Sequence, residues 1–168
     1  DIRKLEHSMT DDVIDGAQVI CSTCIGVGHD MLGRRKFSNI LIDEATQAIE
    51  PATWVPIMRG CRRLVLVGDH KQLPPTVISR RAEDDGLRRS LFERLIDVGI
   101  TPTMLKTQYR MHPVIAEYSS ARYYDNQLEN GVTANERPAP AGFLWPDWEA
   151  PVAFIPVDGV EELAVDGK

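Results

Sequence analysis

The chain has 168 residues, of which 43% are hydrophobic and 26% charged, a composition typical of a globular protein with a packed core. Its 19 Lys and Arg against 25 Asp and Glu give a net charge of −6, which by itself argues against nucleic-acid binding, because phosphate contacts need basic side chains. No apolar run approaches the roughly 20 residues of a membrane-spanning helix, so we predict no membrane partner. Most of the acidic excess lies after residue 100.

The first half of the chain contains three short apolar runs that predict strands, at 17–21, 39–42 and 63–67. Apolar runs without alternation are typical of strands that are buried on both faces. A helix is predicted before the first run, over 1–15, and a second over 46–59, which has a suitable length for the crossover between parallel strands. The alternation predicts an α/β fold with a parallel sheet.

The second half continues this pattern less regularly. An amphipathic helix is predicted over 87–98, a strand at 103–105 and a helix over 114–124 that Pro113 opens. After Gly131 several prolines indicate a loop, and one further strand is predicted at 152–157.

Cysteine is sparse, with Cys21, Cys24 and Cys61 only, so no disulfide framework is indicated and a reducing, intracellular setting is expected. Cys21 and Cys24 form a C-x-x-C pair, and a redox or zinc protein is therefore one reading of the chain. His29 alone does not complete a zinc site, which leaves this reading third in rank.

Two acids, Asp43 and Glu44, directly follow the predicted strand at 39–42. At the carboxyl end of a parallel strand they would project into the ligand crevice of an open α/β sheet. One carboxylate can hold magnesium, and the other can orient and deprotonate a water molecule. The alternative is an acidic pair that merely ends a strand before a helix.

A second polar segment, GDHKQLPP at 68–75, follows the strand predicted at 63–67. Gln72 could sense a terminal phosphate through hydrogen bonds, and Asp69 could add to a metal shell. The alternative is a Gly-Asp turn followed by a proline-rich loop.

A third segment, QYRMHP at 108–113, precedes a predicted helix. Arg110 is suited to a phosphate clamp, because its guanidinium is planar, forked and permanently charged, and Tyr109 could stack on a base. The alternatives are a surface ion pair and a core tyrosine. For His112, a structural hydrogen bond is favoured over a role as ligand.

The segments DEATQ (43–47), GDHKQLPP and QYRMHP, in this order, resemble motifs II, III and IV of superfamily-one helicases, most closely the up-frameshift group. The stretch 19–28 is similar to motif Ic of that group, and the resemblance covers roughly residues 1–157. It implies a RecA-like P-loop NTPase core that uses ATP and Mg²⁺. On the matched positions, Asp43 would bind Mg²⁺ and Glu44 would be the catalytic carboxylate.

The resemblance also implies roles for the other matched residues. Asp69 would add to the nucleotide site, and Gln72 would contact the γ-phosphate. Tyr109 would lie against the adenine, and Arg110 would reach the γ-phosphate.

Family members bind RNA or single-stranded DNA, and the resemblance implies that Ser22, Thr23 and Gly26 face the nucleic-acid backbone. Basic clusters at 34–36, 80–81 and 88–89 offer further phosphate contacts, with a solvated charged face as the alternative. The phosphate loop pattern G-x-x-x-x-G-K-[ST] does not occur in the 168 residues. The chain is therefore expected to be an interior piece, with 1–102 as the C-terminal part of a first RecA-like domain and 103–168 as the N-terminal part of a second.

The sequence thus predicts part of an ATP-dependent helicase motor that is inactive as an isolated piece. Its relatives translocate 5′ to 3′, and the resemblance implies RNA surveillance, with RNA-surveillance proteins as partners and the cytoplasm, or alternatively the nucleus, as location. The competing hypothesis, motivated by the missing phosphate loop, is a non-catalytic helicase-like module that binds a partner or nucleic acid.

Overall fold

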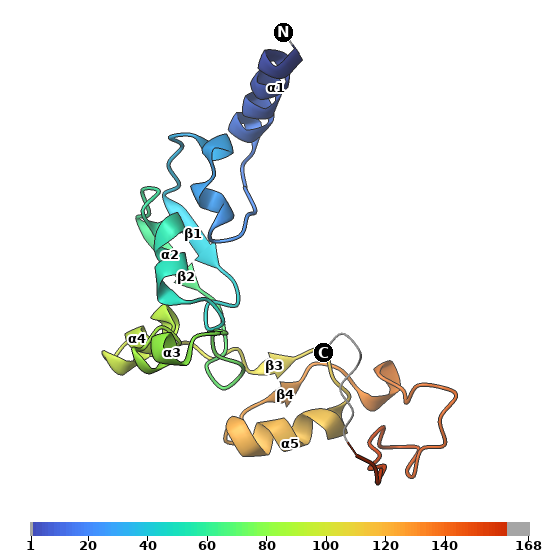
Figure 1. Cartoon of the computed structure of the whole chain (residues 1–168). Helices are drawn as coiled ribbons and strands as arrows, with labels where there is room; N and C mark the ends of the chain where they lie inside the picture. Colours follow the sequence, from blue (N-terminus) through green and yellow to red (C-terminus); the bar gives the residue numbers. More distant parts are fainter. Residues whose placement is uncertain (1, 161–168) are drawn as a thin grey trace. The chain divides into compact units, whose positions relative to one another are not determined.

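The computed structural model describes residues 2–160, and the chain forms two compact units, 1–102 and 103–168 (Figure 1). Their assignment to the first and second RecA-like domains stays a prediction. Among the described residues, no helix is both long and apolar enough to cross a membrane.

Two parallel strands form the centre of the first unit. β1 (Asn39–Ile42) pairs with β2 (Arg63–Leu66) so that Ile42 lies opposite Leu66. The backbone N–H of Val67 donates to the carbonyl of Ile42 at 2.9 Å, and this bond extends the pairing past the strand ends. The helix α2 (Glu50–Ile57) forms the crossover, which confirms the predicted parallel βαβ unit.

The crossover helix is shorter than the predicted 46–59. It begins at Glu50 because residues 43–48 form turns, and a proline follows in the first turn, where a missing N–H does no harm. Thr53 is fully buried within α2 and donates its hydroxyl to the carbonyl of Glu50 at 2.7 Å.

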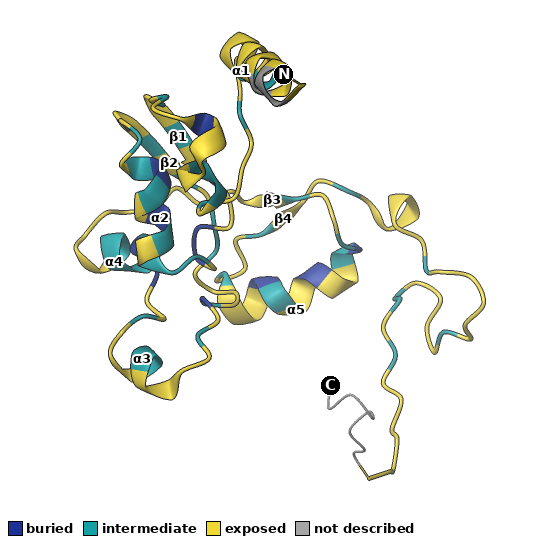
Figure 2. Cartoon of the chain, turned by 45° about the horizontal axis from the view of Figure 1, so that its top comes forward, coloured by how far each residue is buried: buried dark blue, intermediate teal, exposed yellow. Residues whose placement is uncertain are grey.

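The strands were predicted to be buried on both faces, and this prediction is wrong. Ile42 is buried, whereas Leu41 is 65% exposed and its register partner Val65 is 51% exposed (Figure 2). Side chains alternate between the two faces of a sheet, and the face that carries Leu41 and Val65 is the exposed one.

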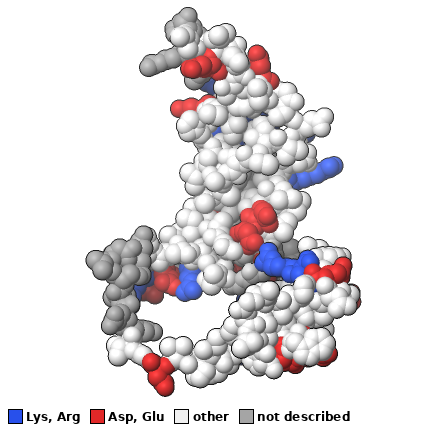
Figure 3. Space-filling view, turned by 90° about the vertical axis from the view of Figure 1, so that its right-hand side faces the viewer, with Lys and Arg blue, Asp and Glu red and all other residues white. Residues whose placement is uncertain are grey.

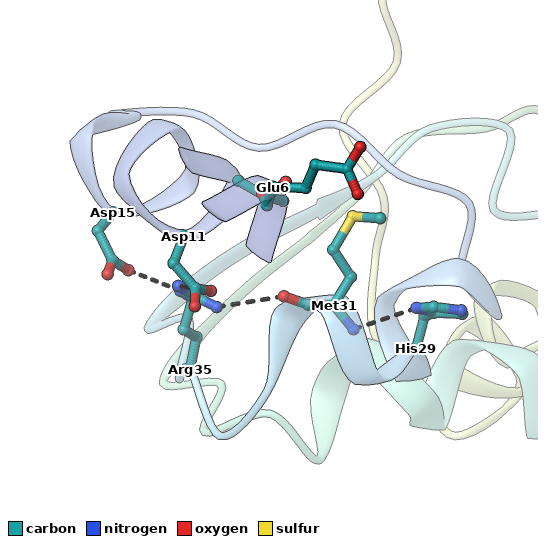
Figure 4. Close-up of polar contacts among 7 residues, drawn as sticks. Glu6, Asp11, Asp15, His29, Met31 and Arg35 are labelled. Atoms are coloured by element: carbon teal, nitrogen blue, oxygen red, sulfur yellow. Dashed lines mark hydrogen bonds and ion pairs between the residues drawn. The ribbon is translucent and has the colours of Figure 1, made fainter. Parts of the chain in front are cut away.

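The helix α1 (Ile2–Gly16) confirms the prediction over 1–15. It is fastened by Arg35, whose Nε donates to Asp15 at 2.6 Å and whose Nη2 donates to Asp11 at 2.7 Å (Figure 4). The same guanidinium donates to the carbonyl of Met31 at 3.2 Å, and its hydrogen bond lowers the pKa of Asp15. One arginine therefore joins α1 to the segment that leads into β1.

The predicted strand at 17–21 is wrong, because these residues belong to none of the described strands, and Val19 is exposed. A strand requires a neighbouring ladder, and the local apolar pattern alone does not supply one. Two short 3₁₀ turns follow, η1 (Gly26–Gly28) and η2 (Asp30–Leu32).

The helix predicted over 87–98 begins later, as α4 (Leu91–Asp97), after the short α3 (Arg80–Asp84). Ser90 sets the start of α4, because its hydroxyl accepts the N–H of Glu93 at 3.2 Å while the Glu93 carboxylate accepts the N–H of Ser90 at 3.0 Å. This reciprocal pair is a capping box, which the S-x-x-E spacing encodes.

The second unit contains α5 (Pro113–Tyr123) and two short parallel strands, β3 (Thr107–Gln108) and β4 (Glu129–Asn130). α5 confirms the predicted helix, and buried His112 caps it by accepting the N–H of Val114 at 3.2 Å. Alanine and serine side chains, Ala116 and Ser120, are the buried ones on α5 (Figure 2). The short η3 (Ala134–Glu136) follows β4.

Two predicted strands of this unit are wrong. The pairing strand is β3 rather than 103–105, and Leu105 is strongly exposed. Residues 152–157 belong to none of the described strands, and Phe154 is 90% exposed. Both segments are apolar enough for a strand, but hydrogen-bond pairing decides where the strand forms.

Candidate functional site

The acidic pair follows β1 directly, as predicted, and its backbone is unusual. Glu44 has a φ of +50°, a left-handed conformation that side chains other than glycine rarely adopt. Asp43 Oδ1 accepts the N–H of Glu44 at 3.0 Å, and Gln47 Nε2 donates to Glu44 Oε2 at 3.0 Å. Both acids are exposed. Such strained residues cluster at functional sites, where the surrounding structure holds them in place.

The loop after β2 is brought against the loop after β1 by a glycine. A Cβ added to Gly68 would lie 3.0 Å from the backbone nitrogen of Thr46 and 3.1 Å from two of its side-chain atoms. The N–H of Ala45 also donates to the carbonyl of Val67 at 2.8 Å, and both Ala45 and Thr46 are buried. The acidic pair after β1 and the polar segment that begins at Gly68 therefore start at the same edge of the sheet.

Asp69 holds Gln72 within the second loop. Its Oδ1 accepts the N–H of Lys71 at 2.9 Å, and its Oδ2 accepts the side-chain amide of Gln72 at 2.9 Å. The backbone N–H of Gln72 donates to the carbonyl of Asp69 at 3.1 Å. Asp69 thereby fixes the orientation of the Gln72 side chain, a positioning role that the sequence did not predict.

The carboxylates at this edge fit the chemistry of magnesium. Mg²⁺ prefers oxygen ligands and is usually held by one or two carboxylates together with nucleotide phosphates and water. Asp43 and Glu44 supply carboxylate oxygens at the end of β1, and Asp69 supplies a third carboxylate after β2. Among the described residues, no group of three or more His, Cys, Asp or Glu side chains is gathered as for an all-protein metal site.

Cys21 and Cys24 are free thiols, and burial raises the pKa of Cys24. No described His, Asp or Glu joins them to form a group of three that could hold a metal ion.

The three residues predicted to face nucleic acid are gathered in one turn. Thr23 Oγ1 accepts the N–H of Gly26 at 2.9 Å. A Cβ on Gly26 would lie 2.7 Å from the hydroxyl of Ser22 and 2.8 Å from that of Thr23. Gly26 is therefore needed for the close approach of both hydroxyls, and Ser22 and Thr23 are exposed.

The crossover helix and the residues just after it brace this turn, through side chains that the sequence did not single out. Arg59 Nη2 donates to the carbonyl of Val27 at 2.8 Å, and Arg59 Nη1 donates to the carbonyl of Gly33. A Cβ on Gly28 would lie 3.1 Å from Val55 of α2. No signal in the sequence distinguishes Arg59 from an ordinary surface arginine.

In the second unit, Gln108 organises the segment that carries Tyr109 and Arg110. Its Oε1 accepts the N–H groups of Arg110 at 2.9 Å and of Met111 at 2.8 Å. Its Nε2 donates to the carbonyl of Met111 at 2.9 Å and to Asn130 Oδ1 at 2.7 Å. The Tyr109 and Arg110 side chains are exposed, so both are accessible to a ligand.

Arg137, a residue absent from the predicted site, clamps the same segment. Its Nη2 donates to the carbonyl of Tyr109 at 2.7 Å, and its Nε donates to the carbonyl of Arg110 at 3.0 Å. Arg137 follows η3, whose start is fixed by a capping box between Thr133 and Glu136, and these hydrogen bonds lower the pKa of Glu136.

The predicted basic clusters are largely paired with acids. Arg88 forms an ion pair with Glu83, and Arg89 forms one with Asp97. On the face that Figure 3 shows, acidic side chains likewise lie next to basic ones. These arginines match a solvated charged face better than a phosphate-binding patch.

Comparison with known proteins gives two matches to family models, both described as AAA domain, over residues 1–80 and 87–168. The chain is 46% identical over 165 residues to "Regulator of nonsense transcripts 1" of Caenorhabditis elegans and 44% identical over 165 residues to its homologue in Drosophila melanogaster. It is 43% identical over 165 residues to "ATP-dependent helicase NAM7" of Saccharomyces cerevisiae.

Each alignment covers 98% of this chain but only 15%, 14% and 17% of these relatives, respectively. The parallel βαβ unit, together with the two domain matches, is that of a RecA-like α/β fold. The chain belongs to the regulator-of-nonsense-transcripts family, the up-frameshift group of superfamily-one helicases.

Proposed function

We propose that this chain is part of an ATP-dependent helicase that hydrolyses ATP with Mg²⁺ and moves along RNA. The observation that carries the proposal is the strained Glu44 beside Asp43, at the sheet edge where the Gly68 loop also begins. The identity to relatives named regulator of nonsense transcripts and ATP-dependent helicase supports it.

In this proposal, Asp43 would hold Mg²⁺, which would supply positive charge to neutralise the charge that develops during phosphate transfer. Glu44 orients the attacking water and accepts its proton. Gln72, which Asp69 holds in place, contacts the γ-phosphate. A residue that contacts both the phosphate and a fixed loop can transmit the state of the nucleotide to the rest of the unit.

Tyr109 and Arg110 complete the proposed nucleotide contacts. The exposed ring of Tyr109 stacks on the adenine, and the forked guanidinium of Arg110 binds the γ-phosphate. Gln108 and Arg137 fix the backbone between them, so both side chains start from a defined position.

The proposed nucleic-acid surface is the turn of Ser22, Thr23 and Gly26, with RNA as the substrate and single-stranded DNA as the alternative. Its hydroxyl and backbone groups bond the phosphate backbone without a basic patch, so a net charge of −6 is compatible with binding. We infer 5′-to-3′ translocation, a role in RNA surveillance with surveillance proteins as partners, and a cytoplasmic location, with the nucleus as alternative.

The variant Glu44→Gln tests the proposal in the full-length protein. It removes the base but keeps the size of the side chain, so ATP binding should persist while RNA-stimulated hydrolysis falls at least a hundredfold. The matched control is Glu149→Gln, the same change at an exposed position of the second unit. Unchanged turnover in Glu44→Gln would overturn the role of Glu44, and a wild-type protein without ATP hydrolysis would favour a non-catalytic module.

A further inference from the structure

We propose that Gly131 is a positioning residue for purine recognition, because its missing side chain leaves the space in which the ring of Tyr109 lies. The inference rests on the proposed function and adds a positioning residue to the same site. A Cβ on Gly131 would lie 2.6 Å from Cδ1 and 2.7 Å from Cζ of Tyr109, with Cε1 between them nearer still. Cδ1 and Cζ are the two ring neighbours of Cε1, and both are only slightly farther away than Cε1 itself. The added carbon would therefore lie over the face of the ring and not beyond its edge.

The backbone of Gly131 does not itself call for glycine. Its φ lies outside the left-handed region, in which Gly33, Gly60, Gly86, Gly99 and Gly142 are found. Conformational freedom therefore gives no reason for the residue, and the close approach to Tyr109 does.

Both partners are held from the backbone side. The N–H of Gly131 donates to the carbonyl of Gln108 at 2.8 Å, directly after the pairing of β3 with β4. The carbonyl of Tyr109 accepts from Arg137 at 2.7 Å. The main chain on either side of the contact is thus fixed, while the ring itself is 64% exposed.

This arrangement gives a ring with one face on backbone and the rest open to a ligand. An aromatic ring stacks on the base of a nucleotide, and the attraction grows with the stacked area, so a purine is favoured over a pyrimidine. Removing such a ring weakens binding by roughly 5- to 150-fold. The same loss is expected when the ring is present but displaced.

Gly131→Ala should displace the ring at little cost to the fold, because the exposed Tyr109 side chain can rotate away. The variants Gly131→Ala, Tyr109→Ala and the double variant are compared with wild type in the full-length protein. Gly159→Ala is the matched control, since nothing lies within 4 Å of an added Cβ there. The probes are a non-hydrolysable ATP analogue with Mg²⁺, the corresponding CTP analogue, and inorganic tripolyphosphate.

We expect Gly131→Ala and Tyr109→Ala each to weaken the affinity for the ATP analogue about tenfold. The double variant should bind the analogue no worse than Tyr109→Ala does. The preference for ATP over CTP should shrink, and tripolyphosphate should bind as to wild type. If Gly131→Ala does not fold, a double variant that does fold would still demonstrate the steric clash between Gly131→Ala and the Tyr109 ring. A double variant that also fails to fold would contradict the clash.

The inference would be overturned by wild-type affinity in Gly131→Ala, additive losses in the double variant, an equal loss for tripolyphosphate, or an unchanged preference for ATP over CTP. Wild-type affinity in Tyr109→Ala would also overturn it, while loss of hydrolysis in Glu44→Gln would leave the proposed function standing. A wild-type protein that does not bind the ATP analogue would instead refute the proposed function.

Discussion

The guanidinium of Arg94 makes two hydrogen bonds to the carboxylate of Glu50, from Nε to Oε2 and from Nη2 to Oε1, each 2.7 Å long. The pair joins α4 to the first turn of α2, and the two side chains are only 37% and 22% exposed. Because α4 follows the loop of Asp69 and Gln72 by way of α3, this ion pair fastens the segment after that loop to the crossover helix.

Glu50→Gln should lower the free energy of unfolding by about 1 kcal/mol, because it replaces a forked, charge-assisted pair with a neutral contact. Thermal denaturation would report a fall of a few degrees. The control is Asp85→Asn, whose partner Arg81 lies 3.9 Å away with both side chains well exposed, and it should have no measurable effect. Equal stability of Glu50→Gln and wild type would refute this structural role.

The same pair gives a pH dependence with a defined sign. The hydrogen bond from Arg94 lowers the pKa of Glu50, and a further bond from Trp54 acts in the same direction. A lowered folded-state pKa means that the stabilisation is present above the unfolded value of about 4.3 and is lost as the pH falls through the folded value. Denaturation of wild type and Glu50→Gln between about pH 3 and 7 should show their difference in stability shrinking towards low pH. A constant difference would contradict the assignment.

Glu44→Gly should raise the free energy of unfolding by up to about 1 kcal/mol, because glycine adopts a φ of +50° without steric strain. Glu44→Gln keeps the strain and is the matched control, with no gain expected. Both variants should lose ATP hydrolysis. Chemical denaturation measures the first effect, and a Glu44→Gly variant no more stable than Glu44→Gln would show that the backbone there is not strained.

Gly68→Ala should destabilise the first unit by about 1 to 3 kcal/mol and reduce ATP hydrolysis. The added methyl meets the backbone nitrogen of buried Thr46, which cannot move aside as a flexible side chain would. Gly16→Ala is the control, because its added carbon meets nothing within 4 Å. Thermal denaturation and turnover of both variants are the measurements, and wild-type stability of Gly68→Ala would rule out the close approach of the two loops.

Arg59→Lys should weaken binding of a single-stranded RNA oligonucleotide roughly fivefold while leaving ATP affinity unchanged. Lysine keeps the positive charge, but its single ammonium group cannot bond the carbonyls of Val27 and Gly33 at the same time, as the guanidinium does. The turn of Ser22 and Thr23 is therefore held less firmly. The control is Arg62→Lys, at a nearby exposed position. Equal RNA affinity in the two variants would mean that bracing by Arg59 does not matter for binding.

Features that depend on local sequence were predictable. The apolar runs predicted β1 and β2, the acids were placed at the end of β1, and Pro113 marked the start of α5. The start of α4 was also encoded, because Ser90 and Glu93 have the spacing of a capping box, although the apolar periodicity alone suggested an earlier start.

Features that depend on distant partners were not predictable. Residues 17–21 have a strand pattern, but no ladder forms beside them among the described residues. Arg59 and Arg137 bond backbone carbonyls far along the chain, and nothing in their neighbourhood in the sequence announces this. The contact of Gly131 with Tyr109 requires the register of β3 and β4, which two-residue strands do not reveal in the sequence.

That contact has an evolutionary consequence. Positions 109 and 131 share one volume, although they are far apart in the chain, so bulk added at one must be given up at the other. A large aromatic residue at 109 restricts 131 to glycine, whereas a small residue at 109 would release that restriction. We therefore expect a side chain at 131 only in relatives that lack a large ring at 109.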